Sequence, residues 1–111
     1  MTTISLLAKD HNLNLRTIDD AMSAISTGLN GCIFTADDIS DQFFNLNNGL
    51  AGEVFQKFVN YQFRACFVIS NIDALGARVV ELAREHRRHP TIRFYDSIDD
   101  AKAWLVKTDN Q

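Results

Sequence analysis

The stretch FFNLNNGLAGEVFQKFVNYQFRACFVIS, residues 43–70, decides the fold because it encodes a helix followed directly by a buried strand. Within it, apolar residues recur at steps of three and four and predict a helix over about 49–60: Leu50, Val54, Phe55, Phe58 and Val59. The segment FRACFVIS, residues 63–70, is apolar on both faces, as the central strand of a parallel sheet is. The stretch therefore predicts a helix that packs on a central strand.

The segments on either side continue an alternation of strands and helices. Upstream, the pattern predicts a strand over 3–8 and a second strand at Leu13 and Leu15 that pairs with it in a hairpin. A helix capped by Thr17 and stopped by Gly28 follows. After it come a buried strand over 31–35 and a short capped helix or turn over 36–44. Downstream, it predicts a helix through Leu75, Val79 and Leu82 that ends before Pro90, a strand over 91–95, and a last helix capped by Asp96-Ser97.

The predicted order is β(β)αβαβαβα. Strands that are joined through helices favour parallel pairing with right-handed crossovers. We therefore expect one α/β domain over residues 1–111, a sandwich with a mostly parallel sheet of about four or five strands, one mixed edge at the N-terminus, and about four helices.

Composition limits the classes of function. A hydrophobic content of 46%, a charged content of 23% and a formal net charge of -3 are ordinary for a globular protein and argue against a nucleic-acid partner. The chain shows no apolar run of roughly 20 residues and no signal peptide, so we expect no membrane partner. Cys32 and Cys66 lie in apolar runs without motif spacing, which is typical of buried thiols in a cytoplasmic protein. We expect no metal and no cofactor.

The opening stretch also resembles the signature of a bacterial domain-of-unknown-function family, number 4180: F-F-x-L-x-x-G-L-A-G-E-x-x-Q-K-F-x-N-Y-x-x-R-x-A, followed by an apolar strand. The residues that meet it are Phe43, Phe44, Leu46, Gly49, Leu50, Ala51, Gly52, Glu53, Gln56, Lys57, Phe58, Asn60, Tyr61 and Arg64, with Cys66 at the final small position. The resemblance implies a fold class, because the family has no established activity.

A smaller likeness is to STAS domains of the anti-sigma-antagonist type. In those domains a strand is followed by a loop that ends in Ser-Gly-Leu at a helix start, and the serine is phosphorylated. NNGL, residues 47–50, is similar in place and letters, with Asn48 at the serine position. Because asparagine cannot be phosphorylated, this likeness implies regulation by binding.

The start of the predicted helix holds the first candidate site. Asn48 as an N-cap would satisfy a free N–H group of the first turn, and Gly49 gives the turn conformational freedom. The same N–H groups form an anion site as an alternative to a structural cap. Gly52 costs the helix about 1 kcal/mol relative to alanine. We expect a close packing contact at Gly52, with another backbone or subunit, before a ligand contact.

Polar residues of the same helix form a second candidate. Glu53, Gln56 and Asn60 fall at i, i+3 and i+7 and so share one face. This face binds a partner or a small polar ligand in one interpretation. In the other, it is a solvated surface whose side chains bond to neighbouring loops.

Basic residues near Pro90 form a third candidate. Arg84, Arg87 and Arg88 would dock an acidic partner or a phosphate. His86 and His89 suggest a zinc pair, but no cysteine or carboxylate cluster accompanies them. Basic residues that complement a helix C-terminus explain the whole group as well.

Two functions follow from these candidates. The first is a regulatory or interaction module that binds a protein partner, or itself as a homo-oligomer, through residues 43–61. The alternative is a small-molecule or anion binder, including an enzyme of unknown class, that uses the helix start at Asn48-Gly49 with Glu53 and the Arg84–Arg88 cluster. The chain shows no recognisable nucleophile–base pair, which favours a protein that is not an enzyme.

Overall fold

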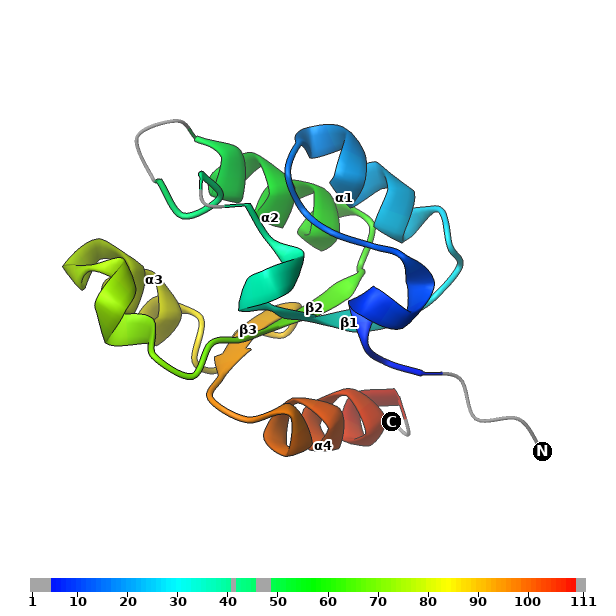
Figure 1. Ribbon diagram of the computed structural model, residues 1–111. Helices are drawn as coiled ribbons and strands as arrows, with labels where there is room; N and C mark the ends of the chain where they lie inside the picture. The colour runs from blue at the N-terminus through cyan, green and yellow to red at the C-terminus, as the bar shows by residue number, and fades with distance from the viewer. Residues whose placement is uncertain (1–4, 41, 46–48, 110–111) are drawn as a thin grey trace.

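Three parallel strands form the sheet: β1 (Gly31–Thr35), β2 (Arg64–Val68) and β3 (Ile92–Tyr95). They pair in the order β1-β2-β3, with Ile33 opposite Cys66 and Phe67 opposite Phe94. The structure, a computed structural model, describes residues 5–40, 42–45 and 49–109 (Figure 1). The central position predicted for the strand within 63–70 is confirmed.

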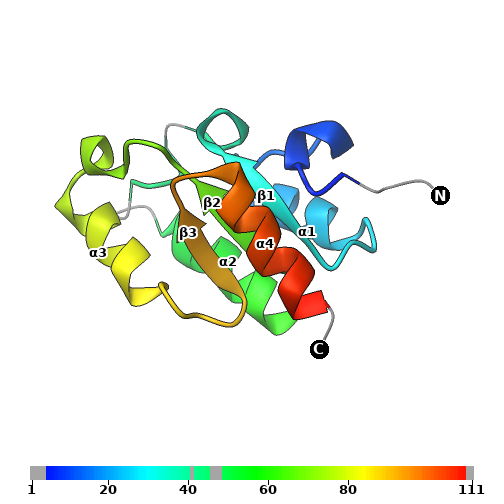
Figure 2. The same ribbon diagram turned by 90° about the horizontal axis from the view of Figure 1, so that it is seen from below.

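Four α-helices surround this sheet: α1 (Ile18–Ile25), α2 (Leu50–Asn60), α3 (Ala77–Glu85) and α4 (Ile98–Asp109). Figure 1 shows α1 and α2 over one face of the sheet and α4 over the other, and Figure 2 shows α3 outside the β3 edge. Within the described residues, short 3-10 helices lie in the connections: η1 (Ala8–His11), η2 (Ala36–Asp38) and η4 (Ile72–Leu75). No helix in the described part of the chain is both long and apolar enough to cross a bilayer.

The core consists of two clusters, because successive side chains of each strand point to opposite faces of the sheet. Phe34 and Phe67 lie on the α2 side, where Phe67 stacks at 5.7 Å between ring centroids on both Phe34 and Phe43. The other face packs under α4, with these members: Ile33, Cys66, Val68, Ala101, Trp104 and Leu105. The phenylalanines of the opening stretch therefore lie in the core or pack against it, whereas Tyr61, whose spacing also predicts a core position, is 55% exposed.

The two cysteines occupy opposite faces of the sheet. Cys32 belongs to the cluster on the α2 side and Cys66 to the cluster under α4, and both thiols are free. Burial raises the pKa of the Cys32 thiol to about 12 and also raises the pKa of Cys66. Both are therefore structural core residues that ionise only far above neutral pH.

The prediction of four or five strands is wrong at the N-terminal end. Among the described residues, Leu7 forms a single parallel bridge to Ile33, and the chain then enters η1. Asn12 takes a left-handed conformation, with φ of 58°, and Leu15 bridges to Ile39, also in parallel. The two segments thus reach different partners, so the predicted hairpin between them does not form.

Two turns are held by aspartate caps. At the start of α1, Asp20 Oδ2 accepts hydrogen bonds from the N–H groups of Arg16, at 2.7 Å, and Thr17, at 3.1 Å. Asp38 in η2 accepts from the N–H of Thr35 at 2.8 Å and from its hydroxyl at 3.0 Å. The N-cap predicted at Thr17 and the short capped turn predicted after residue 35 are both confirmed.

The direction of the strands determines at which edge of the sheet each connecting segment lies. Because the strands are parallel, each connecting helix begins at the carboxyl edge of the sheet and ends at the amino edge. Figure 2 shows α2, α3 and α4 beginning on one side of the molecule and ending on the other. The segments that directly follow β1 and β2 therefore lie together at the carboxyl edge.

Candidate functional site

Helix α2 begins differently from the prediction. Gly49, not Asn48, occupies its N-cap position, with φ of 75° in the left-handed region, which glycine adopts without strain. The carbonyl of Gly49 accepts the first helical hydrogen bond, from the N–H of Glu53 at 3.1 Å. Asn48 itself lies outside the described residues.

Gly52 lies on the exposed side of α2. A Cβ built on this residue would meet no heavy atom within 4 Å, apart from its chain neighbours and its own helix. The described residues therefore supply no packing contact at Gly52, and the predicted contact with another subunit stays a prediction. The space beside Gly52 is open, and no other described part of the chain fills it.

The polar row on α2 faces away from the core. Glu53, Gln56 and Asn60 are all exposed, and Gln56 Nε2 donates a hydrogen bond to Asn60 Oδ1 at 2.9 Å. Val59, on the same side of the helix, keeps 38% of its surface exposed, although the sequence pattern assigns it to the buried stripe. We call this surface, formed by Gly52, Glu53, Gln56, Val59 and Asn60, the α2 outer face.

The histidines near Pro90 hold backbone groups in place. His86 Nδ1 donates to the carbonyl of Leu82 at 2.8 Å, in the last turn of α3. His89 Nδ1 accepts from the N–H groups of Thr91 and Ile92, each at 3.0 Å, so the proton of its neutral ring is on Nε2. Desolvation, followed by the charges of His86 and Arg93, lowers the pKa of His89. These bonds favour the structural interpretation over a zinc pair.

The described residues offer no third ligand for a zinc ion at His86 and His89. No group of three or more His, Cys, Asp or Glu side chains that could hold a metal ion occurs in residues 5–40, 42–45 and 49–109. A zinc site in a protein normally has at least three protein ligands.

The arginines of the third candidate are exposed. Arg84 pairs with Glu81 at 3.2 Å on the surface of α3, while Arg87 and Arg88 lie in the turn that follows. This turn is at the amino edge of the sheet, because α3 ends there. The start of α2 lies at the carboxyl edge. The ring of His86, within the cluster, packs at 5.3 Å on Phe55 in the middle of α2. A joint anion site with Gly49 and Glu53 stays a prediction.

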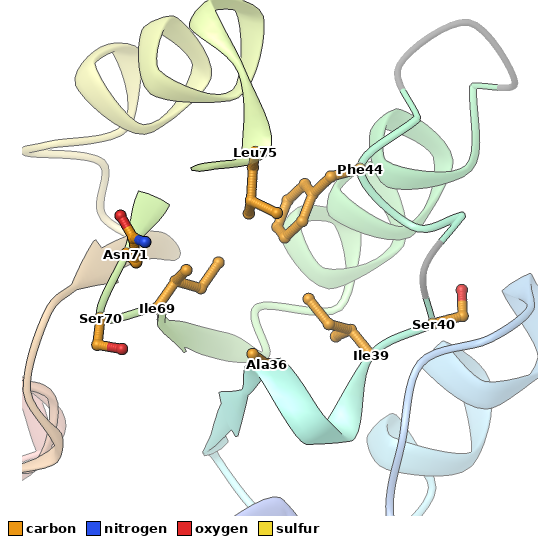
Figure 3. Close-up of a pocket in the computed structure, with 8 residues that line it drawn as sticks. All are labelled: Ala36, Ile39, Ser40, Phe44, Ile69, Ser70, Asn71 and Leu75. Atoms are coloured by element: carbon orange, nitrogen blue, oxygen red, sulfur yellow. The ribbon is translucent and has the colours of Figure 1, made fainter. Parts of the chain in front are cut away.

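A hollow at the carboxyl edge was not predicted from the sequence. It has a volume of about 310 Å³ and lies between the segments that follow β1 and β2, with Phe44 across from them (Figure 3). Its lining residues are Ala36, Ile39, Ser40, Phe44, Ile69, Ser70, Asn71 and Leu75. We call it the carboxyl-edge hollow.

Leu75 is the lining residue whose position differs most from the sequence prediction. The apolar spacing places Leu75 in the buried stripe of the helix that contains Val79. In the structure Leu75 ends η4, and α3 begins only after Gly76, whose φ is 102°. Leu75 is 44% exposed, and its side chain lies beside Phe44 at the rim of the hollow (Figure 3). The useful signal is the rule that ligands of open α/β sheets bind outside the carboxyl ends of strands.

Comparison with known proteins identifies the family. Residues 4–105 match the domain of unknown function DUF4180. Because this match covers nearly the whole chain, the protein belongs to that family, as the signature within residues 43–66 indicates. No curated protein and no solved structure matches the chain.

Proposed function

We propose that this member of the DUF4180 family is an interaction module that binds a protein partner, or a second copy of itself, through the α2 outer face. The observation that carries the proposal is the exposed glycine in the middle of the helix. Glycine in a helix interior costs about 1 kcal/mol relative to alanine. At Gly52 the described chain offers no contact that requires the missing side chain. The close approach of another molecule's backbone supplies such a reason.

The chemistry around Gly52 suits a protein surface. Val59, on the same face of the helix, is 38% exposed and offers apolar area to a partner. Gln56 and Asn60 already bond to each other at 2.9 Å, so their positions are partly fixed before a partner arrives. Apolar area beside pre-positioned amides supports contact with another backbone, because amides both donate and accept hydrogen bonds.

A STAS-like regulatory role extends this proposal. Helix α2 follows β1 through the loop that holds the NNGL sequence, which is the strand–loop–helix order of that likeness. Asparagine stands where the phosphorylated serine would be. The proposed module is therefore controlled by the availability of its partner and not by phosphorylation at this position.

The anion-binding alternative draws no comparable support. Within the described residues, its arginine cluster contacts α2 through His86, whose ring packs on Phe55 in the middle of the helix and not on the helix start at Gly49. Catalysis on the α2 outer face would have to use one carboxylate and two amides, which do not form an acid–base pair. Protein binding is the function that this surface favours.

Crosslinking in cells tests the proposal. A photo-reactive amino acid replaces Gln56 on the α2 outer face or, as the control, exposed Lys102 on α4. We expect a discrete crosslinked product from position 56 and none from position 102. The variant Gly52→Arg should lose that product, because a long side chain fills the open space beside the helix. Equal products at the two positions, or a product that persists in Gly52→Arg, would contradict the proposal.

Two controls make the result interpretable. The circular dichroism melt of Gly52→Arg should match that of the wild type, because a side chain at this position meets nothing within 4 Å. Sedimentation velocity then separates the two kinds of partner. A dimer that dissociates in Gly52→Arg identifies self-association, and a monomer at all concentrations identifies a different protein.

A further inference from the structure

We infer that the carboxyl-edge hollow is a binding site for a small uncharged molecule, mainly apolar, that carries one hydrogen-bonding group. The inference goes beyond the proposed protein interface, because the hollow shares no residue with the α2 outer face. Its volume of about 310 Å³ is at the lower end of the range for small-molecule sites, so the ligand is compact.

The position of the hollow is the first support. Ala36, Ile39 and Ser40 come from the segment after β1, and Ile69 to Leu75 from the segment after β2. Two neighbouring parallel strands therefore end at its base. In open α/β sheets this crevice is where ligands bind, because the loops that diverge from adjacent strands leave room between them.

The apolar lining is the second support. Ile69 is nearly buried at the base, and Phe44 is anchored from behind by its ring contacts with Phe67, at 6.1 Å, and Phe94, at 5.9 Å. Leu75 lies beside Phe44 at the rim of the hollow and is 44% exposed (Figure 3). An apolar ligand that packs on both side chains would remove this exposed area from water.

The polar atoms of the lining define the rest of the ligand. Ser70 and Asn71 are exposed and line one side of the hollow (Figure 3). A hydroxyl and an amide both donate and accept hydrogen bonds, so one polar group of the ligand that bonds to them adds affinity and orientation. The Oγ of Ser40 is buried and is turned away from Ile39, so it is not part of the contact surface.

The absence of charge in the lining selects against ions. None of the eight lining residues carries a charged side chain. A charged group that enters this hollow would lose hydration without gaining a counter-charge. A separate hollow of about 240 Å³ lies on the other side of Phe44 and Leu75 and is lined by Arg78. We therefore expect anions to bind in the hollow lined by Arg78 and not in the carboxyl-edge hollow.

The test is an NMR titration of the full chain with labelled isoleucine and leucine methyl groups. The probes have one ring and differ in their polar group: benzyl alcohol, toluene, benzoate and benzylammonium. We expect benzyl alcohol to shift the methyl signals of Ile39, Ile69 and Leu75 in a saturable manner. The methyl signals of Ile33 and Leu105, on the α4 side of the sheet, should not move.

Matched variants identify the contacts. Leu75→Ala should weaken the binding of benzyl alcohol by about tenfold, whereas Val106→Ala, which removes a similarly exposed apolar side chain on α4, should leave it unchanged. Ser70→Ala should weaken benzyl alcohol by about tenfold and leave toluene unaffected, because only the alcohol forms a hydrogen bond with the hydroxyl. Gly52→Arg should bind benzyl alcohol normally, so failure of the proposed interface would not affect this result.

Three outcomes would overturn the inference. One is the lack of any saturable shift with benzyl alcohol at millimolar concentration. Another is shifts that are equally large on the α4 side of the sheet. The third is binding of benzoate or benzylammonium at least as tight as that of benzyl alcohol, which would show that charge and not apolar contact governs the site.

Discussion

Two glycines of this chain should respond to alanine in opposite directions. At Gly52 the new methyl group meets nothing within 4 Å, so only the backbone effect remains, and Gly52→Ala should stabilise the fold by about 1 kcal/mol. At Gly31, in β1, a Cβ would lie 2.2 Å from the backbone oxygen of Arg64 in β2. Relief requires β1 and β2 to separate, so Gly31→Ala should destabilise the fold by about 3 kcal/mol.

Urea denaturation measures both effects, with Trp104 fluorescence and far-ultraviolet circular dichroism as probes. With an m-value of about 1–3 kcal/mol per molar, the midpoint should rise by about 0.3–1 M for Gly52→Ala at an unchanged slope. The midpoint for Gly31→Ala should fall by at least as much. A lower midpoint for Gly52→Ala would mean that the space beside α2 is occupied. A neutral result for Gly31→Ala would refute the close approach of the two strands.

Three further predictions concern the core and its ionisable groups. Phe67→Ala should cost about 3–5 kcal/mol in urea denaturation, because this fully buried ring packs against several other phenylalanine rings. Cys32 and Cys66 should react with a thiol reagent near pH 8 only on unfolding, because burial raises both pKa values; fast reaction of the native protein would contradict this. The folded pKa of His89 lies below its ordinary value of 6.5, so its contribution to stability should be lost as the pH falls below 6.5, and His89→Gln should flatten that part of the pH profile.

The helices and strands with strong patterns were predictable from the sequence. The helix α2 follows from its apolar spacing, and β2 follows from an apolar run too short for a buried helix. Thr17 and Asp20 mark the start of α1 by their chemistry alone. Such local signals hold because capping and amphipathicity act within a few residues of the chain.

The N-terminal strands and the hollow were not predictable, because both depend on contacts between distant segments. Leu7 and Leu15 alternate with polar neighbours as strand residues do, yet each bridges to a different part of the chain. The start of α3 was misplaced for a similar reason, since Leu75 keeps the helical spacing on the far side of Gly76. Spacing alone cannot show that a glycine with φ of 102° separates two elements.

The candidate site on α2 could also be predicted only in part from the sequence. The sequence identifies Glu53, Gln56 and Asn60 as one polar face, and the structure places all three in solvent. It does not reveal that Gly52 stands beside open space, because the surroundings of a glycine depend on the tertiary fold. Of the two contacts predicted at Gly52, the structure shows none within the described chain, and the contact with another subunit stays a proposal.

The most direct test of the central claim measures the affinity of the partner recovered by crosslinking at position 56. Isothermal titration calorimetry would compare the wild type, Gly52→Arg and, as the control, Lys102→Ala on α4. The proposed interface predicts that Gly52→Arg weakens binding by about 100-fold while Lys102→Ala leaves it unchanged. Equal affinity of the wild type and a folded Gly52→Arg variant would contradict the claim that the α2 outer face is the binding surface.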